Sequence, residues 1–160
     1  MSSAETYILF ELADTLYGLN SREILHIDML EHITPVPHTA PAVDGVVFSR
    51  GQVVPALNLR SRFGLPPQPP TLRTRLIFIR FQERTVALVV DAAREFRRVP
   101  AESIRATTDA LNGIAGNYVQ GVTTINERNV LLLNLAVILD LETTLPQLLD
   151  ETASSATSDA

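Results

Sequence analysis

Apolar and polar residues alternate along much of this 160-residue chain, a pattern typical of strands that bury one face. The alternation is clearest in residues 6–13 (TYILFELA) and 75–81 (RLIFIRF). Residues 85–93 (TVALVVDAA) form a near-continuous, valine-rich apolar run, which predicts a strand buried on both faces. Two later runs, YVQGVTTI and NVLLLNLAV, are joined by the polar turn NER. The chain is therefore predicted to be mainly β.

Helical signals are short. We expect helix at about residues 22–30, one turn after Leu59, and a further piece at LAVILDLE. Residues 64–73 (GLPPQPPTLR) predict a proline-rich connector, because proline lacks the backbone donor that a central strand needs. The end of the chain, ETASSATSDA, has no large apolar residue, so we expect one domain over residues 1–145 and a disordered tail over 146–160.

An internal repeat organises the strands. Residues 8–19 (ILFELADTLYGL) align without a gap with residues 77–88 (IFIRFQERTVAL), and both read as strand, polar turn, strand. Residues 45–59 (GVVFSRGQVVPALNL) align in the same way with residues 121–135 (GVTTINERNVLLLNL). Each half thus carries the same two hairpins in the same order. Short strands at this spacing favour a small barrel or sandwich, and two similar halves favour two such barrels.

Composition narrows the class of function. There is no cysteine, which excludes disulfides, thiolate metal sites and thiol catalysis. The net charge of -5 argues against a general nucleic-acid binder. Neither a secretory signal nor an apolar run of membrane-spanning length is visible, so a cytoplasmic location is expected.

No catalytic, cofactor or metal site is predicted. The segment GNYVQGVT has the glycine spacing of a phosphate loop but lacks the Lys-Ser/Thr that should follow. No acid/base pair is evident, and a hydrolase or lyase with a site at a barrel mouth would need such a convergent set. His26, His32 and His38 are evenly spaced but have no acidic ligand at metal-site spacing. Asp91 is expected to accept hydrogen bonds from local backbone donors.

One turn carries an unexpected residue. Turns favour Gly, Asn, Asp, Ser or Pro, yet Arg50 stands between two predicted strands in Ser49-Arg50-Gly51-Gln52. The sister hairpin turns with Asn-Glu-Arg-Asn, so the scaffold needs a turn here but does not dictate Arg50. Arginine is favoured at interfaces, because its stem packs and its guanidinium fork bonds carboxylates. We interpret Arg50 as a binding residue rather than a solvated turn residue.

With these motifs in view, the chain resembles the CheW family of adaptors. The family hallmark is close to G-V-x-N-L-R-G-x-V-x-P-V-x-D-L-R, and residues 45–60 read GVVFSRGQVVPALNLR. Three more segments are similar to family motifs in the right order: PVPHTAPAVDG, VALVVDAAREF and YVQGVTTINERNVLLLNLAVIL. The resemblance runs from about Tyr7 to Leu141.

The resemblance implies a fold and a function. The fold would be two small five-stranded SH3-like β-barrels, intertwined in one CheW-like domain with short helices. The function would be that of a non-enzymatic cytoplasmic adaptor without cofactors, a monomer in isolation. It would bind the regulatory domain of a CheA-type histidine kinase on one face and the cytoplasmic tip of a chemoreceptor on another. It would therefore join membrane receptor arrays through its partners, with no nucleic acid bound and no direct insertion into the membrane.

The resemblance also places the binding residues. Arg50 would face the receptor tip. Gly45 and Gly51 are interpreted as glycines that supply positive φ and shape the site without contacting a partner. Phe48 is either a core residue, since it alternates with valines, or an outward apolar anchor. The full set expected at the protein-binding surface is Arg50, Phe48, Ser49, Gly51, Gly45, Ile24, His26 and Val43.

Several residues depart from the family pattern. Phe48-Ser49 replaces Asn-Leu, Asn58 replaces the Asp before Leu-Arg, and Ala87 replaces a glycine. His26 stands where the family tends to carry a glutamate that suits an ion pair with the hallmark arginine, so Arg50 would pair with Glu23, with Asp28 or with nothing. These departures leave a second pathway open, an adaptor for a non-flagellar system such as pilus-driven motility.

Overall fold

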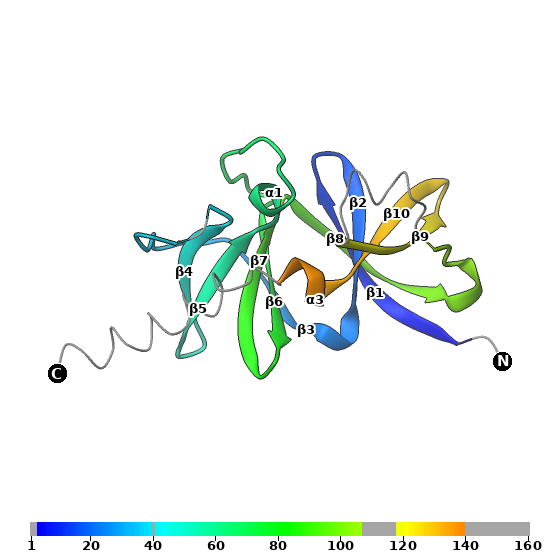
Figure 1. The fold of residues 1–160 in the computed structure, drawn as a ribbon, viewed down its shortest axis with the longest axis horizontal. Coiled ribbons are helices and arrows are strands. Elements are labelled where there is room, and N and C mark those ends of the chain that lie inside the picture. Colours follow the sequence, from blue (N-terminus) through cyan, green and yellow to red (C-terminus); the bar gives the residue numbers. More distant parts are fainter. Residues whose placement is uncertain (1–2, 40, 107–117, 140–160) are drawn as a thin grey trace.

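The computed structural model describes residues 3–39, 41–106 and 118–139. These residues form ten strands, as drawn in Figure 1: β1 (Ala4–Leu12), β2 (Thr15–Asn20), β3 (Ile24–Met29), β4 (Val43–Ser49), β5 (Gln52–Asn58), β6 (Arg75–Phe81), β7 (Arg84–Val90), β8 (Ala92–Pro100), β9 (Val119–Ile125) and β10 (Arg128–Leu133). The short helices are η1 (Ser21–Glu23), α1 (Leu59–Arg62), η2 (Ala101–Ser103) and α3 (Leu135–Ile138). The mainly β prediction is confirmed, whereas the predicted tail over 146–160 lies outside the described residues.

The strands form two five-stranded sheets that exchange hairpins. One sheet has the order β8-β1-β2-β10-β9 and the other β3-β6-β7-β5-β4. Each sheet is assembled from both halves of the chain, because β2 pairs in parallel with β10 and β5 pairs in parallel with β7. Figure 1 shows the first sheet on the right and the second on the left. The halves are therefore intertwined, and neither half contains a complete sheet.

Each sheet closes on itself into a small barrel. Thr34, after β3, exchanges two backbone hydrogen bonds with Val46 of β4, which joins the two edges of one sheet. Arg105, after β8, does the same with Val122 of β9. We name the two units barrel A (β8-β1-β2-β10-β9) and barrel B (β3-β6-β7-β5-β4). These bridges shorten the unpaired strand edges that would otherwise invite aggregation.

The internal repeat extends to a third strand that the sequence patterns did not show. Strand β3 pairs with β6 as β8 pairs with β1, and both ladders contain a bulge. The bulged residues, Leu25 and Arg94, are related by the same offset as Ile8 and Ile77. The prediction of helix over residues 22–30 is therefore wrong beyond the single turn of η1. The β-branched residues Ile24 and Ile27 instead pair with β6 in an edge strand.

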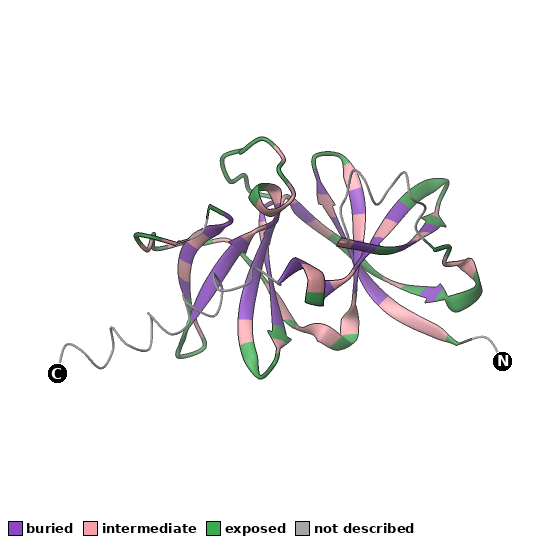
Figure 2. Ribbon diagram, in the orientation of Figure 1, coloured by how far each residue is buried: buried purple, intermediate pink, exposed green. Residues whose placement is uncertain are grey.

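The apolar side chains form three cores. One fills barrel B, with Phe78 and Val54 among its members, and another fills barrel A, with Leu9 and Val130. The largest lies between the barrels, where β1 and β2 face β6 and β7. Helix α3 adds Leu135 and Ile138 to this central core and lies between the barrels in Figure 1. Strand β7 is buried continuously over Val86–Val90, as its valine-rich run predicts, and Figure 2 shows this burial in purple.

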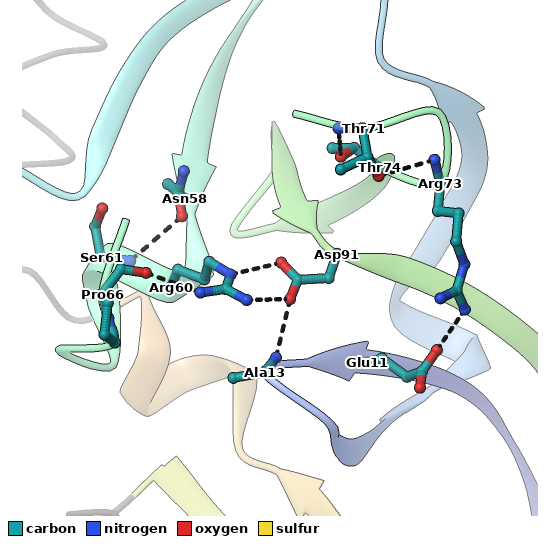
Figure 3. Close-up of polar contacts among 10 residues, drawn as sticks. All are labelled: Glu11, Ala13, Asn58, Arg60, Ser61, Pro66, Thr71, Arg73, Thr74 and Asp91. Carbon is teal, nitrogen blue, oxygen red and sulfur yellow. Dashed lines mark hydrogen bonds and ion pairs between the residues drawn. The ribbon is translucent and has the colours of Figure 1, made fainter. Parts of the chain in front are cut away.

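A polar lock crosses between the barrels. Arg60 of α1 donates from Nε and Nη2 to the carboxylate of Asp91, at 2.7 Å each, and from Nη1 to the carbonyl of Pro66 in the connector. Asp91 also accepts the backbone N–H of Ala13 from the β1–β2 turn, at 2.9 Å (Figure 3). Burial opposes ionisation of Asp91, but the hydrogen bonds from Arg60 and Ala13 outweigh it and lower the pKa of the carboxyl. The partners of Asp91 are thus long-range, and the expectation of local donors is wrong.

We expect Asp91→Asn to lower the free energy of unfolding at pH 7 by about 1–3 kcal/mol, because it leaves the Arg60 guanidinium without its carboxylate in a partly solvated site. The folded-state pKa of Asp91 lies below its ordinary value of 3.8, so the stabilisation is present above that value and is lost as pH falls through the folded-state pKa. Urea unfolding at pH 7 and at pH 3 measures both effects. An equal gap between wild type and variant at the two pH values would contradict this assignment.

Candidate partner-binding surface

All four hairpins turn through two residues with positive φ, the signature of a type I′ turn. At the β4–β5 turn these are Arg50, with φ of 51°, and Gly51, with φ of 79°. The other three turns place Ala13-Asp14, Gln82-Glu83 and Asn126-Glu127 in the same positions. The hairpin register therefore imposes the left-handed conformation, and an arginine is an unfavourable choice for it. Asn126, the counterpart of Arg50 in the repeat, tolerates this conformation better.

Arg50 projects from the tip of the β4–β5 hairpin, which is exposed at its end in Figure 2. Within the described part of the chain, its guanidinium makes no ion pair and no side-chain hydrogen bond. Neither acid that the sequence offered as its partner contacts it. Asp28 lies 3.3 Å from Nε2 of His26 instead, and burial raises the pKa of Glu23, partly offset by Arg22. Arg50 is therefore available to a carboxylate of a partner.

Phe48 points outward, which decides between its two interpretations. Its side chain is 78% exposed, although the flanking Val47 is buried inside barrel B. Its cross-strand partner Val53 is 49% exposed, and Met29, at the end of β3, is 59% exposed. Phe48 and Val53 thus flank the turn that carries Arg50, and Met29 lines the same depression as Phe48.

A groove of about 550 Å³ lies between the end of β3 and the end of β4. Its lining includes Phe48 and Ser49 of β4, Asp28 and Met29 of β3, and Glu31 after β3. Its floor includes Leu76 and Phe78, which are buried members of the barrel B core. We refer to this depression as the β3–β4 groove.

His26 packs β3 against β6 beside this groove. Its ring stacks on Phe78, with centroids 4.3 Å apart and an angle of 16° between the planes. The side chain is 17% exposed, and its Nε2 has no hydrogen bond of normal geometry. His26 is thus a packing residue of β3 as much as a surface residue. No group of three His, Asp or Glu able to hold a metal occurs within residues 3–39, 41–106 and 118–139.

The remaining residues of the expected set shape the surface from below. Val43 is buried in the central core, and Ile24 packs against that core at the far end of β3 from Met29. Gly45 faces the segment that closes barrel B, where a Cβ atom would lie 2.1 Å from the Thr34 carbonyl oxygen. Gly51 has nothing within 4 Å of such an atom. The structure therefore brings Phe48, Ser49, Arg50 and Gly51 together at the surface and leaves Ile24, Val43 and Gly45 beneath it or apart from it.

A polar cavity of about 240 Å³ beside the connector includes Asn58, Arg60 and Asp91 in its lining. A hydrolytic site would need a group whose pKa is shifted toward neutrality. The pKa of Asp91 is shifted the other way, and the fork of Arg60 is already occupied by that carboxylate. This cavity is therefore part of the polar lock between the barrels.

Comparison with known proteins places this architecture. The model of the CheW-like domain matches residues 6–143. The chain belongs to the CheW-like domain family. The chemotaxis protein CheW of Rhizobium meliloti is 30% identical over 80% of this chain and 83% of its own length. A probable chemotaxis protein CheW of Rhizobium etli is 28% identical over 82% and 84%.

The fold agrees with a solved CheW structure. The scaffolding protein TtCheW from Thermoanaerobacter tengcongensis matches with a TM-score of 0.78 at 23% identity, over 88% of this chain and 95% of that protein. The family assignment and the expected two-unit fold are thus confirmed. None of the helices within the described ranges has the length and apolar character needed to traverse a lipid bilayer.

Within the CheW-like family pattern, the hallmark separates into two roles. Its Arg-Gly pair forms the exposed turn, while Arg60, its last residue, lies inside the polar lock. Sequence patterns did not identify Met29 as a lining residue of the groove or Val53 as an exposed neighbour of Phe48. The alternation around Val53 could have suggested an outward position, but Met29 reaches Phe48 through tertiary structure alone.

We expect Gly45→Ala to destabilise the protein by about 3 kcal/mol or more, because its Cβ would overlap the Thr34 carbonyl in the strand pairing that closes barrel B. Gly51→Ala is the matched control: it meets open space and bears only the left-handed backbone cost of about 1 kcal/mol. Thermal melts of both variants measure the difference. Equal losses would show that Gly45 does not mark a close approach.

Proposed function

We propose that this protein is a non-enzymatic chemotaxis adaptor that couples chemoreceptors to a CheA-type histidine kinase. Membership of the CheW-like family and the relatives named chemotaxis protein CheW support this function. An adaptor needs docking surfaces rather than reacting groups. The exposed β4–β5 turn and the adjoining β3–β4 groove supply one such surface.

Arg50 is the observation that carries the receptor-binding assignment. It occupies a left-handed position that Asn126 fills in the sister hairpin, and its guanidinium has no carboxylate partner in the described part of the chain. Ala13 and Gln82 occupy the same left-handed position in two other hairpins, so the assignment rests on the exposed guanidinium of Arg50 and not on its backbone. We propose that Arg50 forms a bidentate ion pair with a carboxylate on the cytoplasmic tip of the receptor.

We propose that the adaptor couples receptor and kinase by transmitting displacements between them, without making or breaking a covalent bond. The receptor tip docks on barrel B near Arg50, and the regulatory domain of the kinase docks on another face. The central core and the Arg60–Asp91 lock hold the barrels in one orientation, so a shift at one docked partner is transmitted to the other as a rigid-body displacement. We propose that the adaptor is a monomer in isolation and joins the membrane-associated array through these partners. Service in a non-flagellar pathway stays a prediction. A receptor tip that differs in sequence opposite Phe48, Ser49 and His26 would support that pathway over the flagellar one.

We expect Arg50→Asn to keep or raise the melting temperature, because Asn tolerates positive φ better than Arg. The same change should weaken binding to the cytoplasmic hairpin fragment of a chemoreceptor from the same organism by at least about tenfold, the effect of losing roughly 1.4 kcal/mol. Isothermal titration calorimetry measures the binding, and circular dichroism measures the melt.

The matched control is Arg84→Asn, which removes an exposed arginine beside the β6–β7 turn. It should leave receptor binding within about twofold of wild type. Unchanged binding by Arg50→Asn would remove Arg50 from the docking surface. A large drop in its melting temperature would make Arg50 a structural residue.

A further inference from the structure

We propose that the β3–β4 groove is a specificity pocket that binds one apolar side chain of the receptor tip in contact with Phe48 and Met29. Asp28 and Glu31 would face a basic group beside that side chain. This inference rests on the proposed docking of the receptor at the Arg50 turn, and it names the chemistry of the partner there.

The apolar walls are exposed without a structural need. Single exposed apolar side chains are ordinary, but Phe48, Met29 and Val53 are 78%, 59% and 49% exposed around one turn. Phe48 of β4 and Met29 of β3 both line this depression. An apolar group that fills it would be removed from water against both side chains.

The internal repeat provides a built-in comparison. The positions in barrel A that correspond to Phe48, Val53 and Met29 carry Thr124, Asn129 and Arg98, all exposed. The barrel scaffold is therefore satisfied by polar residues at all three positions. The apolar residues are a property of this one surface, as expected of a binding site and not of the fold.

The floor of the groove is rigid. Phe78 and Leu76 belong to the barrel B core, and the ring of His26 stacks on that of Phe78. The hydrogen bonds between Thr34 and Val46 close the barrel next to it. A pocket formed in advance loses little conformational entropy when it is filled, which favours selective binding.

The charged residues beside the groove indicate which charges the bound receptor segment carries. Glu31 and Asp28 line the groove together with His32, the carboxylate of Asp28 lying 3.3 Å from Nε2 of His26, and Arg50 lies at the turn next to Phe48. The complementary segment carries a basic group, an apolar side chain and a carboxylate in that spatial order. A helical receptor tip can present such a series at positions three and four apart.

The test measures binding of the chemoreceptor cytoplasmic hairpin fragment to the full chain and to Phe48→Thr, which copies the residue of the sister position. We expect binding weaker by about tenfold or more, as for loss of an interface anchor, with an unchanged melting temperature. Leu72→Thr is the control, because Leu72 is 89% exposed in the connector outside this groove, and it should bind within about twofold of wild type. Glu31→Gln should reduce the salt dependence of binding.

The outcomes separate this inference from the proposed function. If Phe48→Thr binds as wild type while Arg50→Asn does not, the pocket is overturned and the docking surface stands. If wild type itself fails to bind the fragment, the proposed receptor docking fails, and the pocket with it. If sedimentation shows wild-type chains associating through Phe48 while receptor binding ignores that residue, the groove takes a second copy of this chain and the proposal is overturned.

Discussion

The exchange of hairpins between the two halves of the chain is the constraint on which the structure depends. Because β2 pairs in parallel with β10, and β5 with β7, barrel A and barrel B are each completed by strands distant in sequence. Neither barrel can close before both halves of the chain are present. The arrangement also forces β1 and β2 against β6 and β7, which creates the central core. Two barrels bound in this way behave as one body.

Polar contacts between the barrels add to the link that the exchanged hairpins provide. Asp91 ties Arg60 on the barrel B side to the β1–β2 turn of barrel A. From the same helix α1, Arg62 donates to the carbonyl oxygens of Val137 and Ile138 and to the hydroxyl of Tyr118, which ties α3 to α1. Cations are favoured at the carbonyl end of a helix, so Arg62 suits this position. A rigid frame follows, and an adaptor that transmits small displacements needs such a frame.

The sequence was sufficient for the four hairpins and for the family. Their alternating strands and two-residue turns are local signals, and the gapless repeat reinforced each one. The sequence patterns did not predict β3 and β8, the third strands of the two halves. A bulge at Leu25 and at Arg94 breaks the period of two in both, and one solvated side leaves them rich in polar residues. Residues 22–30 therefore lack the unbroken alternation that would have indicated a strand.

In the candidate site, too, the sequence predicted the local features and missed those that depend on tertiary contacts. Arg50 was predictable, because a turn is a local feature and its sister showed what the scaffold requires. The β3–β4 groove was not, since Met29 and Phe48 meet through the closure of barrel B between Thr34 and Val46. The pairing of Arg60 with Asp91 was equally hidden, because it depends on the parallel register of β5 and β7.

Coupling requires that this protein hold its two partners at the same time. The direct measurement is analytical ultracentrifugation of the full chain mixed with the receptor hairpin fragment and the regulatory domain of the CheA-type kinase. We predict a complex that contains all three components and does not form when this chain is omitted. Displacement of one partner by the other would contradict it, because the two partners would then share a single surface.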